Sequence, residues 1–252
     1  MATATTYTRF ELLRLFRNRQ SLAFTVLIPV LMFFLIAVPN KNDHNFGGDA
    51  HHHTGLFAPQ YYMISLLAFG GLAAILSIGP RIAAERIIGW NRMLRLTPLT
   101  PGAYLRTKVV TGYASAGVAI VLLYILGIAF DVRMGIGVWI ELTALVLLAL
   151  IPYAGMGIGL GHLLNADAAG AAAGIGASLF AFLGGAWFPI TSGGLQDFSK
   201  LLPSFWLTGA GNVGYVGVSN PWGVEGWIVV AVWSIAATVF AMWAYRRDTR
   251  RA

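Results

Sequence analysis

Residues 58–80 read "APQYYMISLLAFGGLAAILSIGP", a continuous run in which no side chain is charged. A helix needs about 20 mostly apolar residues to cross the hydrocarbon layer of a membrane, and this run is long enough. Its apolar residues are continuous, whereas a spanning strand of a barrel alternates apolar and polar residues over about 10 positions. The stretch therefore predicts a membrane-spanning α-helix.

The rest of the chain has the same character. Only 11% of its 252 residues are charged, against about 25% in an ordinary soluble domain, and the mean hydropathy is +0.70. We expect an all-α, polytopic membrane protein with six transmembrane helices in a single domain over residues 1–252. Pro152 lies inside one of the spans, where we expect a kink. Besides residues 58–80, the expected spans are 21–38, 109–130, 136–161, 169–189 and 223–245.

The basic residues indicate how the chain is oriented. Six spans place 14 of the 17 basic residues on one side, and such residues mark the cytoplasmic side of a membrane. We therefore expect both termini in the cytoplasm and, because Arg, Ala and Gly are abundant as in GC-rich bacterial genomes, a location in the bacterial cytoplasmic (inner) membrane. Basic residues at that surface contact anionic lipid headgroups, so membrane lipid is an expected partner and nucleic acid is not.

Two further segments lie outside the spans near the N-terminus. Residues 7–20 interleave Arg with Phe and Leu, which favours a helix in the cytoplasmic interface over a merely basic flank. The first outer loop contains His51, His52 and His53, and imidazole can bind zinc, nickel or copper. Adjacent side chains diverge and no fixed ligand spacing is present, so we favour a solvated loop over a metal site.

A broken, polar stretch follows the fifth expected span. Residues 195–202 and 204–209 are too short to cross a membrane, and we expect two short helices that dip into the outer interface. They could form a gate for substrate exit or a passive lid. The candidate gate residues are Phe188, Pro189, Phe205 and Trp206.

Small residues are concentrated in the fourth and fifth expected spans. They include glycines at 155, 157, 159 and 161, and the pair Gly170 and Gly174, which has the small-xxx-small spacing. Small residues let helix backbones approach closely in lipid. The pattern does not distinguish packing within the chain from a contact between two subunits, so both alternatives stay open.

The motifs of nucleotide-binding and hydrolytic enzymes are absent from the sequence. It contains no G-x-x-x-x-G-K-[ST], no H-E-x-x-H, no G-x-S-x-G and no cysteine. We expect a protein that is not an enzyme and that holds no cofactor of its own. Few ionisable residues fall in the spans, and we expect Glu141, Glu225, His162 and Asp167 to be hydrated near an interface. The driving energy should then come from a partner.

The longest polar interruption is the cytoplasmic connection over residues 81–108. Its helix-forming first half ends at Thr97, because a residue before proline is displaced from the α region. Thr100 then caps a new helix that begins at Pro101 and runs into the third span.

These boundaries leave a short helix over residues 90–96. Trp90, Met93 and Leu94 share one of its faces, while Arg92 and Arg95 can reach headgroups or an acidic partner. An apolar knob on a short helix suits insertion into the groove of another protein. The connection therefore predicts a protein partner on the cytoplasmic side.

The connection resembles the motif E-R-x-x-G-[TS]-x-x-x-L-x-x-T-P-[LV]-[ST]-P of the permease subunits of type-2 ATP-binding-cassette (ABC) exporters, in particular the daunorubicin-resistance-like group. Here it reads "ERIIGWNRMLRLTPLTP" over residues 85–101, and Trp90 replaces the usual small hydroxyl residue. The resemblance extends to the six spans, the preceding interfacial helix and the outer helices. The residues that match are Glu85, Arg86, Gly89, Leu94, Thr97, Pro98, Leu99, Thr100 and Pro101.

The resemblance implies that this connection is a coupling helix that docks on a separate ATPase subunit, which would bind ATP and magnesium. It also implies a second permease copy or paralogue. The aromatic residues of the spans would suit an amphipathic drug, lipid or peptide, although ordinary packing is the simpler explanation for each of them. The candidate pathway residues are Tyr61, Tyr62, Phe69, Tyr113 and Phe180.

Two other functions compete with ATP-driven export. An ion-coupled secondary transporter is disfavoured by the scarcity of charges in the spans and by the lack of a visible inverted repeat. A non-transporting membrane protein, such as an immunity factor or a sensor anchor, stays open.

Overall fold

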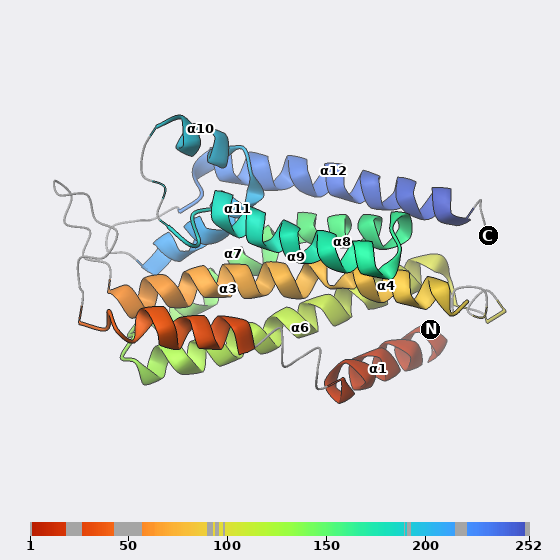
Figure 1. Ribbon diagram of the computed structural model, residues 1–252, viewed down its shortest axis with the longest axis horizontal. Coiled ribbons are helices and arrows are strands. Elements are labelled where there is room, and N and C mark those ends of the chain that lie inside the picture. Colours follow the sequence, from red (N-terminus) through yellow and green to blue (C-terminus); the bar gives the residue numbers. More distant parts are fainter. Residues whose placement is uncertain are drawn as a thin grey trace.

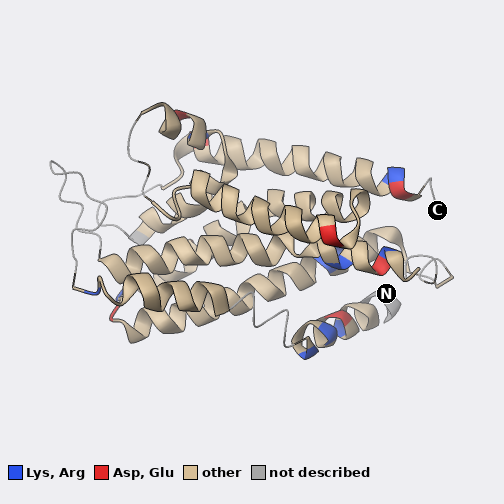
Figure 2. Cartoon of the chain, in the orientation of Figure 1, with Lys and Arg blue, Asp and Glu red and all other residues tan. Residues whose placement is uncertain are grey.

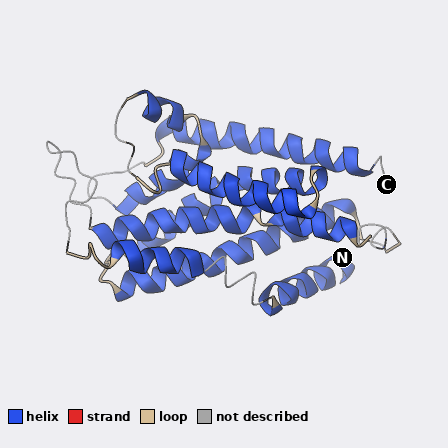
Figure 3. Ribbon diagram, in the orientation of Figure 1, coloured by secondary structure: helices blue, strands red, loops and turns tan. Residues whose placement is uncertain are grey.

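The computed structural model describes residues 2–18, 27–42, 57–89, 93, 96–97, 99–188, 190, 193–214 and 221–249. Within these ranges the chain is helical and contains no strand, as expected for an all-α protein (Figure 3). Long helices run side by side along the longest axis of the molecule, and both ends of the chain lie at the same end of the bundle (Figure 1). The short helix α10 lies at the opposite end.

The described residues form helices of very different lengths. Five helical stretches among them are long and apolar enough to span a membrane: Ala58–Ile87, Pro101–Ala129, Ile136–Leu163, Ala166–Leu183 and Gly223–Thr249. The individual helices are α1 (Ala2–Arg17), α3 (Ala58–Leu76), α4 (Ile78–Ile87), α6 (Pro101–Ala129), α7 (Ile136–Ala149), α8 (Ile151–Leu163), α9 (Ala166–Leu183), α10 (Gly194–Lys200), α11 (Pro203–Gly209) and α12 (Gly223–Thr249), with a 3-10 turn at Ala210–Gly214.

Five of the six expected spans coincide with these stretches. The first, over residues 21–38, is described only from residue 27, where it contains the helix Leu27–Ala37, which ends in a π-helical turn. The second continues beyond its expected end at residue 80 to Ile87, because Pro80 falls in the first turn of α4 and needs no N–H there. Near Pro152, where we expect a kink, the span is divided into α7, which ends at Ala149, and α8, which begins at Ile151, and Leu150 between them keeps helical backbone angles.

The expected helix start after the cytoplasmic connection is also confirmed. Pro101 is the first residue of α6, and the Thr100 hydroxyl accepts a hydrogen bond from the Ala103 N–H at 3.3 Å. The two short outer helices occur as α10 and α11, within a residue or two of their expected bounds. The expected coupling helix over residues 90–96 lies mostly outside the described residues.

The helix pair α3 and α4 occupies the centre of the bundle. Most residues of α3 are buried, and this helix contacts α6, α8 and α9, while α4 contacts α8 and α9. Hydrophobic burial does not drive helices together in lipid, so their association depends on close packing and polar contacts. Helix α8 in turn packs along α12.

Glycines make two of these helix crossings close. A side chain at Gly161 would meet the backbone oxygen of Gly79 at 2.6 Å, and one at Gly155 would meet that of Ala237 at 2.7 Å. The glycines of α8 therefore pack against α4 and α12 within the chain. By contrast, a side chain at Gly170 or Gly174 in α9 would meet nothing within 4 Å among the described residues. Packing within the described chain thus accounts for the first glycine group and not for the second.

We predict that Gly161→Ala weakens the fold and that Gly170→Ala does not. The added methyl group at residue 161 would force α4 and α8 apart, and overpacking of this kind costs about 1–3 kcal/mol. The check is the melting temperature of each purified variant in detergent. Equal melting temperatures for the two variants would show that the α4–α8 crossing is looser than its geometry indicates.

Candidate functional site

Charged residues lie near the end of α4, at the end of the bundle where both termini lie (Figure 2), and Glu85 and Arg86 are in this last part of α4, within the connection over residues 81–108. Adjacent residues of a helix do not share a face, so the two side chains extend toward different neighbours. Glu85 reaches α1 and α6, whereas Arg86 reaches α8 and α12. This one turn of α4 is therefore joined to four other helices.

Glu85 is the centre of a buried ionic cluster. Its Oε1 accepts hydrogen bonds from Lys108 Nζ at 2.5 Å and from Arg14 Nη1 at 3.2 Å, and its Oε2 accepts one from the Tyr104 hydroxyl at 3.0 Å. The side chains of Glu85 and Lys108 are each only 2% exposed. A buried charge is tolerated when it is paired and its remaining hydrogen-bonding positions are filled, which is the case here.

The same cluster fixes the N-terminal helix. Glu11 Oε1 lies 2.8 Å from Lys108 Nζ, and the hydroxyls of Thr8 and Thr107 are 2.8 Å apart. Burial by itself raises the pKa of the Glu11 carboxyl, but the Lys108 ammonium and the hydrogen bond from it lower that pKa by more, so it lies below its ordinary value. Helix α1 is thus attached to α6 by polar contacts.

The exposed side of α1 carries apolar side chains together with the exposed arginines Arg9 and Arg17. Phe10, Leu13 and Phe16 are 46–64% exposed, as expected for a helix whose outer face contacts lipid in the interface.

Arg86 forms the second cluster. Its Nη1 donates to the backbone oxygens of Gly161 at 3.0 Å and Leu164 at 3.1 Å, and its Nη2 lies 2.8 Å from Asp248 Oδ1. The last carbonyl groups of a helix lack partners within that helix, so the guanidinium satisfies two of them at the end of α8. Asp248 Oδ2 also lies 2.9 Å from His162 Nδ1.

The expectation that His162 is hydrated near an interface is wrong. His162 is 2% exposed, because α4 and α12 cover it and Asp248 supplies a polar partner. Lys108 is one of the basic residues that we expected to contact lipid headgroups. It is buried instead, because the carboxylates of Glu11 and Glu85 supply its polar partners.

The expected coupling residues are only partly within the described chain. Gly89 has a φ of +72°, which a glycine adopts without strain, and this turns the chain away from α4. Around it, four apolar side chains are well exposed: Ile87, Ile88, Met93 and Leu96, at 70%, 67%, 58% and 90%. Thr97 is exposed too. Trp90, Arg92, Leu94, Arg95 and Pro98 lie outside the described residues.

The candidate pathway aromatics contact other parts of the chain. The hydroxyl of Tyr61 donates to the Gly185 carbonyl at 3.0 Å, and that of Tyr113 donates to the Leu147 carbonyl at 3.0 Å. The other three make edge-on ring contacts: Tyr62 with Tyr61, Phe69 with Trp187, and Phe180 with Tyr153. Such contacts are those of packing residues, the simpler of the two explanations.

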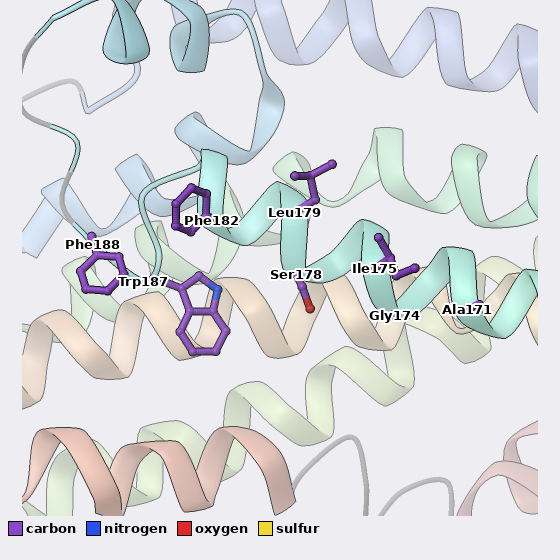
Figure 4. A pocket seen from close by; sticks show the side chains of 8 residues that line it. All are labelled: Ala171, Gly174, Ile175, Ser178, Leu179, Phe182, Trp187 and Phe188. Atoms are coloured by element: carbon purple, nitrogen blue, oxygen red, sulfur yellow. The ribbon is translucent and has the colours of Figure 1, made fainter.

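An open apolar groove of about 920 Å³ runs along α9 (Figure 4). The side chains that line it come from α9 and from the segment that follows, and Ser178 is the one polar residue among them. Ile175 and Leu179 are 68% and 53% exposed. The lining residues are Ala171, Gly174, Ile175, Ser178, Leu179, Phe182, Trp187 and Phe188.

The candidate gate residues divide between two places. Phe188 is 69% exposed and lines the groove, and Pro189 lies outside the described residues. Phe205 and Trp206 pack edge-on in α11, where the Trp206 indole donates to the Lys200 carbonyl at 2.8 Å. They hold α11 against the end of α10.

Comparison with known proteins decides the family. The sequence model of the family described as "ABC-2 type transporter" matches residues 4–215, most of the chain. The chain belongs to the ABC-2 type transporter family. It is also similar to YvfS of Bacillus subtilis (strain 168), which is described as a transport permease, with 23% identity over 201 residues that cover 77% of this chain and 78% of YvfS.

Membership of the ABC-2 family gives the two clusters a context. The family implies the membrane subunit of an ABC transporter and an association with an ABC ATPase subunit. The Glu85–Arg86 pair, recognised in the sequence as part of the coupling motif, has its side chains directed into the permease itself. Sequence reasoning missed the partners Glu11, Lys108 and Asp248, although ionisable residues within or beside long apolar helices were a signal for them.

We predict that Lys108→Met strongly destabilises the permease. Removing the ammonium leaves Glu85 and Glu11 with the largely exposed Arg14 as their remaining counter-charge, and breaking a buried pair costs about 3–5 kcal/mol. The double variant Lys108→Met with Glu85→Gln should be less destabilised than the single one, as measured by thermal melting in detergent. The control is Arg133→Met, whose partner Asp131 is 78% exposed in an open ion pair. If Lys108→Met melts like this control, the buried cluster is not a main support of the fold.

Proposed function

We propose that this protein is the membrane-spanning subunit of an ATP-driven exporter, of the kind found in the daunorubicin-resistance-like group, and that it docks on a separate ATPase subunit through residues 85–98. ATP and magnesium would be bound by that subunit, and this chain is not an enzyme. Both termini and the coupling connection face the cytoplasm of a bacterium. The support is the family, the coupling motif and the basic residues at the end of the bundle where both termini lie.

The exposed apolar tip carries the docking proposal. Ile87, Ile88, Met93 and Leu96 form this tip, which follows the charged pair of α4 and lies where the chain turns back toward α6. Several large apolar side chains exposed together at one site commonly mark a contact with another protein. A groove on the ATPase surface would cover them.

The two ionic clusters explain how movement of the tip would reach the spans. Glu85 of α4 pairs with Lys108 of α6, so the helices on either side of the tip are held together. Arg86 joins the same turn to α8 and α12. A displacement of the tip driven by ATP would therefore move several spans together, which is the requirement for alternating access of a cavity between the two sides.

A second permease copy or paralogue would cover the α9 groove. The open glycines Gly170 and Gly174 permit close approach of another helix, and the exposed apolar residues beside them give it a surface. The pathway for an amphipathic drug, lipid or peptide would then lie between two copies, with the groove as one wall.

The docking proposal predicts that Met93→Asp with Leu96→Asp abolishes ATPase binding. Both side chains are exposed, so the permease should still fold and reach the membrane, whereas carboxylates against an apolar groove are costly. The measurements are co-purification with the ATPase and ATP-dependent transport in vesicles. Arg106→Asp, an exposed site in the first turns of α6, is the control and should keep both. Retention of both by the double variant would refute the docking surface, and transport driven by an ion gradient without ATP would refute the exporter.

The subunit proposal predicts that a cysteine at Ser178 cross-links two permeases. The chain has no native cysteine, so only the introduced thiol can react. Ser178→Cys should give a covalent dimer with a short bis-maleimide, since the groove faces its counterpart on the second copy. Ile235→Cys, which is 66% exposed on α12, is the control and should stay monomeric. Cross-linking at residue 235 and not at 178 would place the interface on α12 instead.

A further inference from the structure

A small polar cavity lies between the ends of α4, α8 and α12. It has a volume of about 250 Å³ and is lined by Arg86, His162, Leu163, Arg247 and Asp248. One water molecule needs roughly 10–15 Å³ of such space, so the cavity has room for a group the size of a phosphate. The cavity lies at the C-terminal end of α12, where Figure 2 shows charged residues of both signs.

The charges around this cavity do not cancel. Asp248 is already shared, because one of its oxygens lies 2.8 Å from Arg86 Nη2 and the other lies 2.9 Å from His162 Nδ1. Arg247 adds a further positive charge and lies over the Trp243 ring, 5.3 Å from its centroid. The lining thus carries two guanidinium groups against one carboxylate, an excess that favours an anion.

Hydrogen-bonding capacity is also left over. Arg86 has five N–H donors. Three of them are used in the contacts with Gly161, Leu164 and Asp248, which leaves two donors for a ligand. His162 Nε2 is buried and has no hydrogen-bond partner within the described chain. Buried polar atoms are rarely left without partners, so we expect a partner for this nitrogen outside the described residues.

The depth of the cavity in the membrane indicates which anion is available. Trp243 is 49% exposed, one turn before Arg247 on the last span, and exposed tryptophans of spans lie at the level of the lipid headgroups. Phosphate groups of anionic lipids are concentrated at that level on the cytoplasmic side. Basic pockets between transmembrane helices on this side bind lipid headgroups.

We propose that this cavity binds the phosphate of an anionic phospholipid headgroup, held by the Arg247 and Arg86 guanidinium groups. Arginine matches phosphate oxygens because its planar N–H donors bind them in pairs. The bound headgroup connects α4 with α12 and so supports the turn from which the coupling tip extends. The inference goes beyond the transport function and needs no ATPase, so its test uses the permease alone.

The test compares two neighbouring arginines. Arg247 lines the cavity and Arg246 does not, yet both are exposed residues of the same helical turn, so Arg247→Gln and Arg246→Gln remove the same charge. The full-length permease and both variants are delipidated in detergent and titrated with phosphatidylglycerol or phosphatidylcholine. Native mass spectrometry counts the bound lipids, and thermal melting reports the stabilisation.

We expect the parent protein to retain one phosphatidylglycerol more firmly than phosphatidylcholine. Arg247→Gln should bind it about tenfold more weakly, the loss of one hydrogen bond to a charged group, whereas Arg246→Gln should bind it like the parent. Inorganic phosphate in large molar excess should leave the lipid in place. Equal loss in both variants would reduce the effect to general surface charge and overturn the site. Displacement by inorganic phosphate would identify a free anion, and not a lipid, as the ligand.

Discussion

The buried ion pair between Glu85 and Lys108 constrains the end of the bundle at which both termini lie. Both charges are almost fully removed from water, so each is stabilised by the other, and the largely exposed Arg14 is a further partner of Glu85. They belong to α4 and α6, the helices that enter and leave the coupling connection. The pair therefore holds α4 and α6 together where they meet that connection, and it fixes the rotation of both helices. Helix α1 attaches to the same cluster through Glu11 and Arg14.

The residue next to Glu85 extends this constraint across the bundle. Because adjacent helical side chains diverge, Arg86 leaves α4 on another face and satisfies carbonyl groups at the end of α8 while it pairs with Asp248 of α12. One dipeptide thus joins the coupling tip to most of the bundle. If a separate ATPase subunit drives transport as we propose, a rigid connection of this kind would carry its movement into the spans.

The periphery of the bundle contrasts with this region. The glycines of α8 bring three helices into close contact, whereas Gly170 and Gly174 of α9 face open space beside exposed apolar side chains. Lipid can cover such a face, and so can a second permease. The groove lies apart from the exposed tip and the polar cavity, both of which adjoin Arg86, so the proposed subunit pairing can be disturbed without the proposed energy coupling and lipid binding.

The sequence by itself determined the local features. Continuous apolar runs gave the positions of the spans, Thr100 and Pro101 gave the start of α6, and the E-R-x-x-G motif led to the ABC-2 family, because each depends on residues close together in the chain. Only the tertiary structure decided which polar residues meet. His162 and Asp248 are 86 residues apart, and Glu85 and Lys108 belong to different helices. Helices that are apolar on every side carry no periodic signal for their rotation or neighbours, so these contacts follow from packing and could not be read from the sequence.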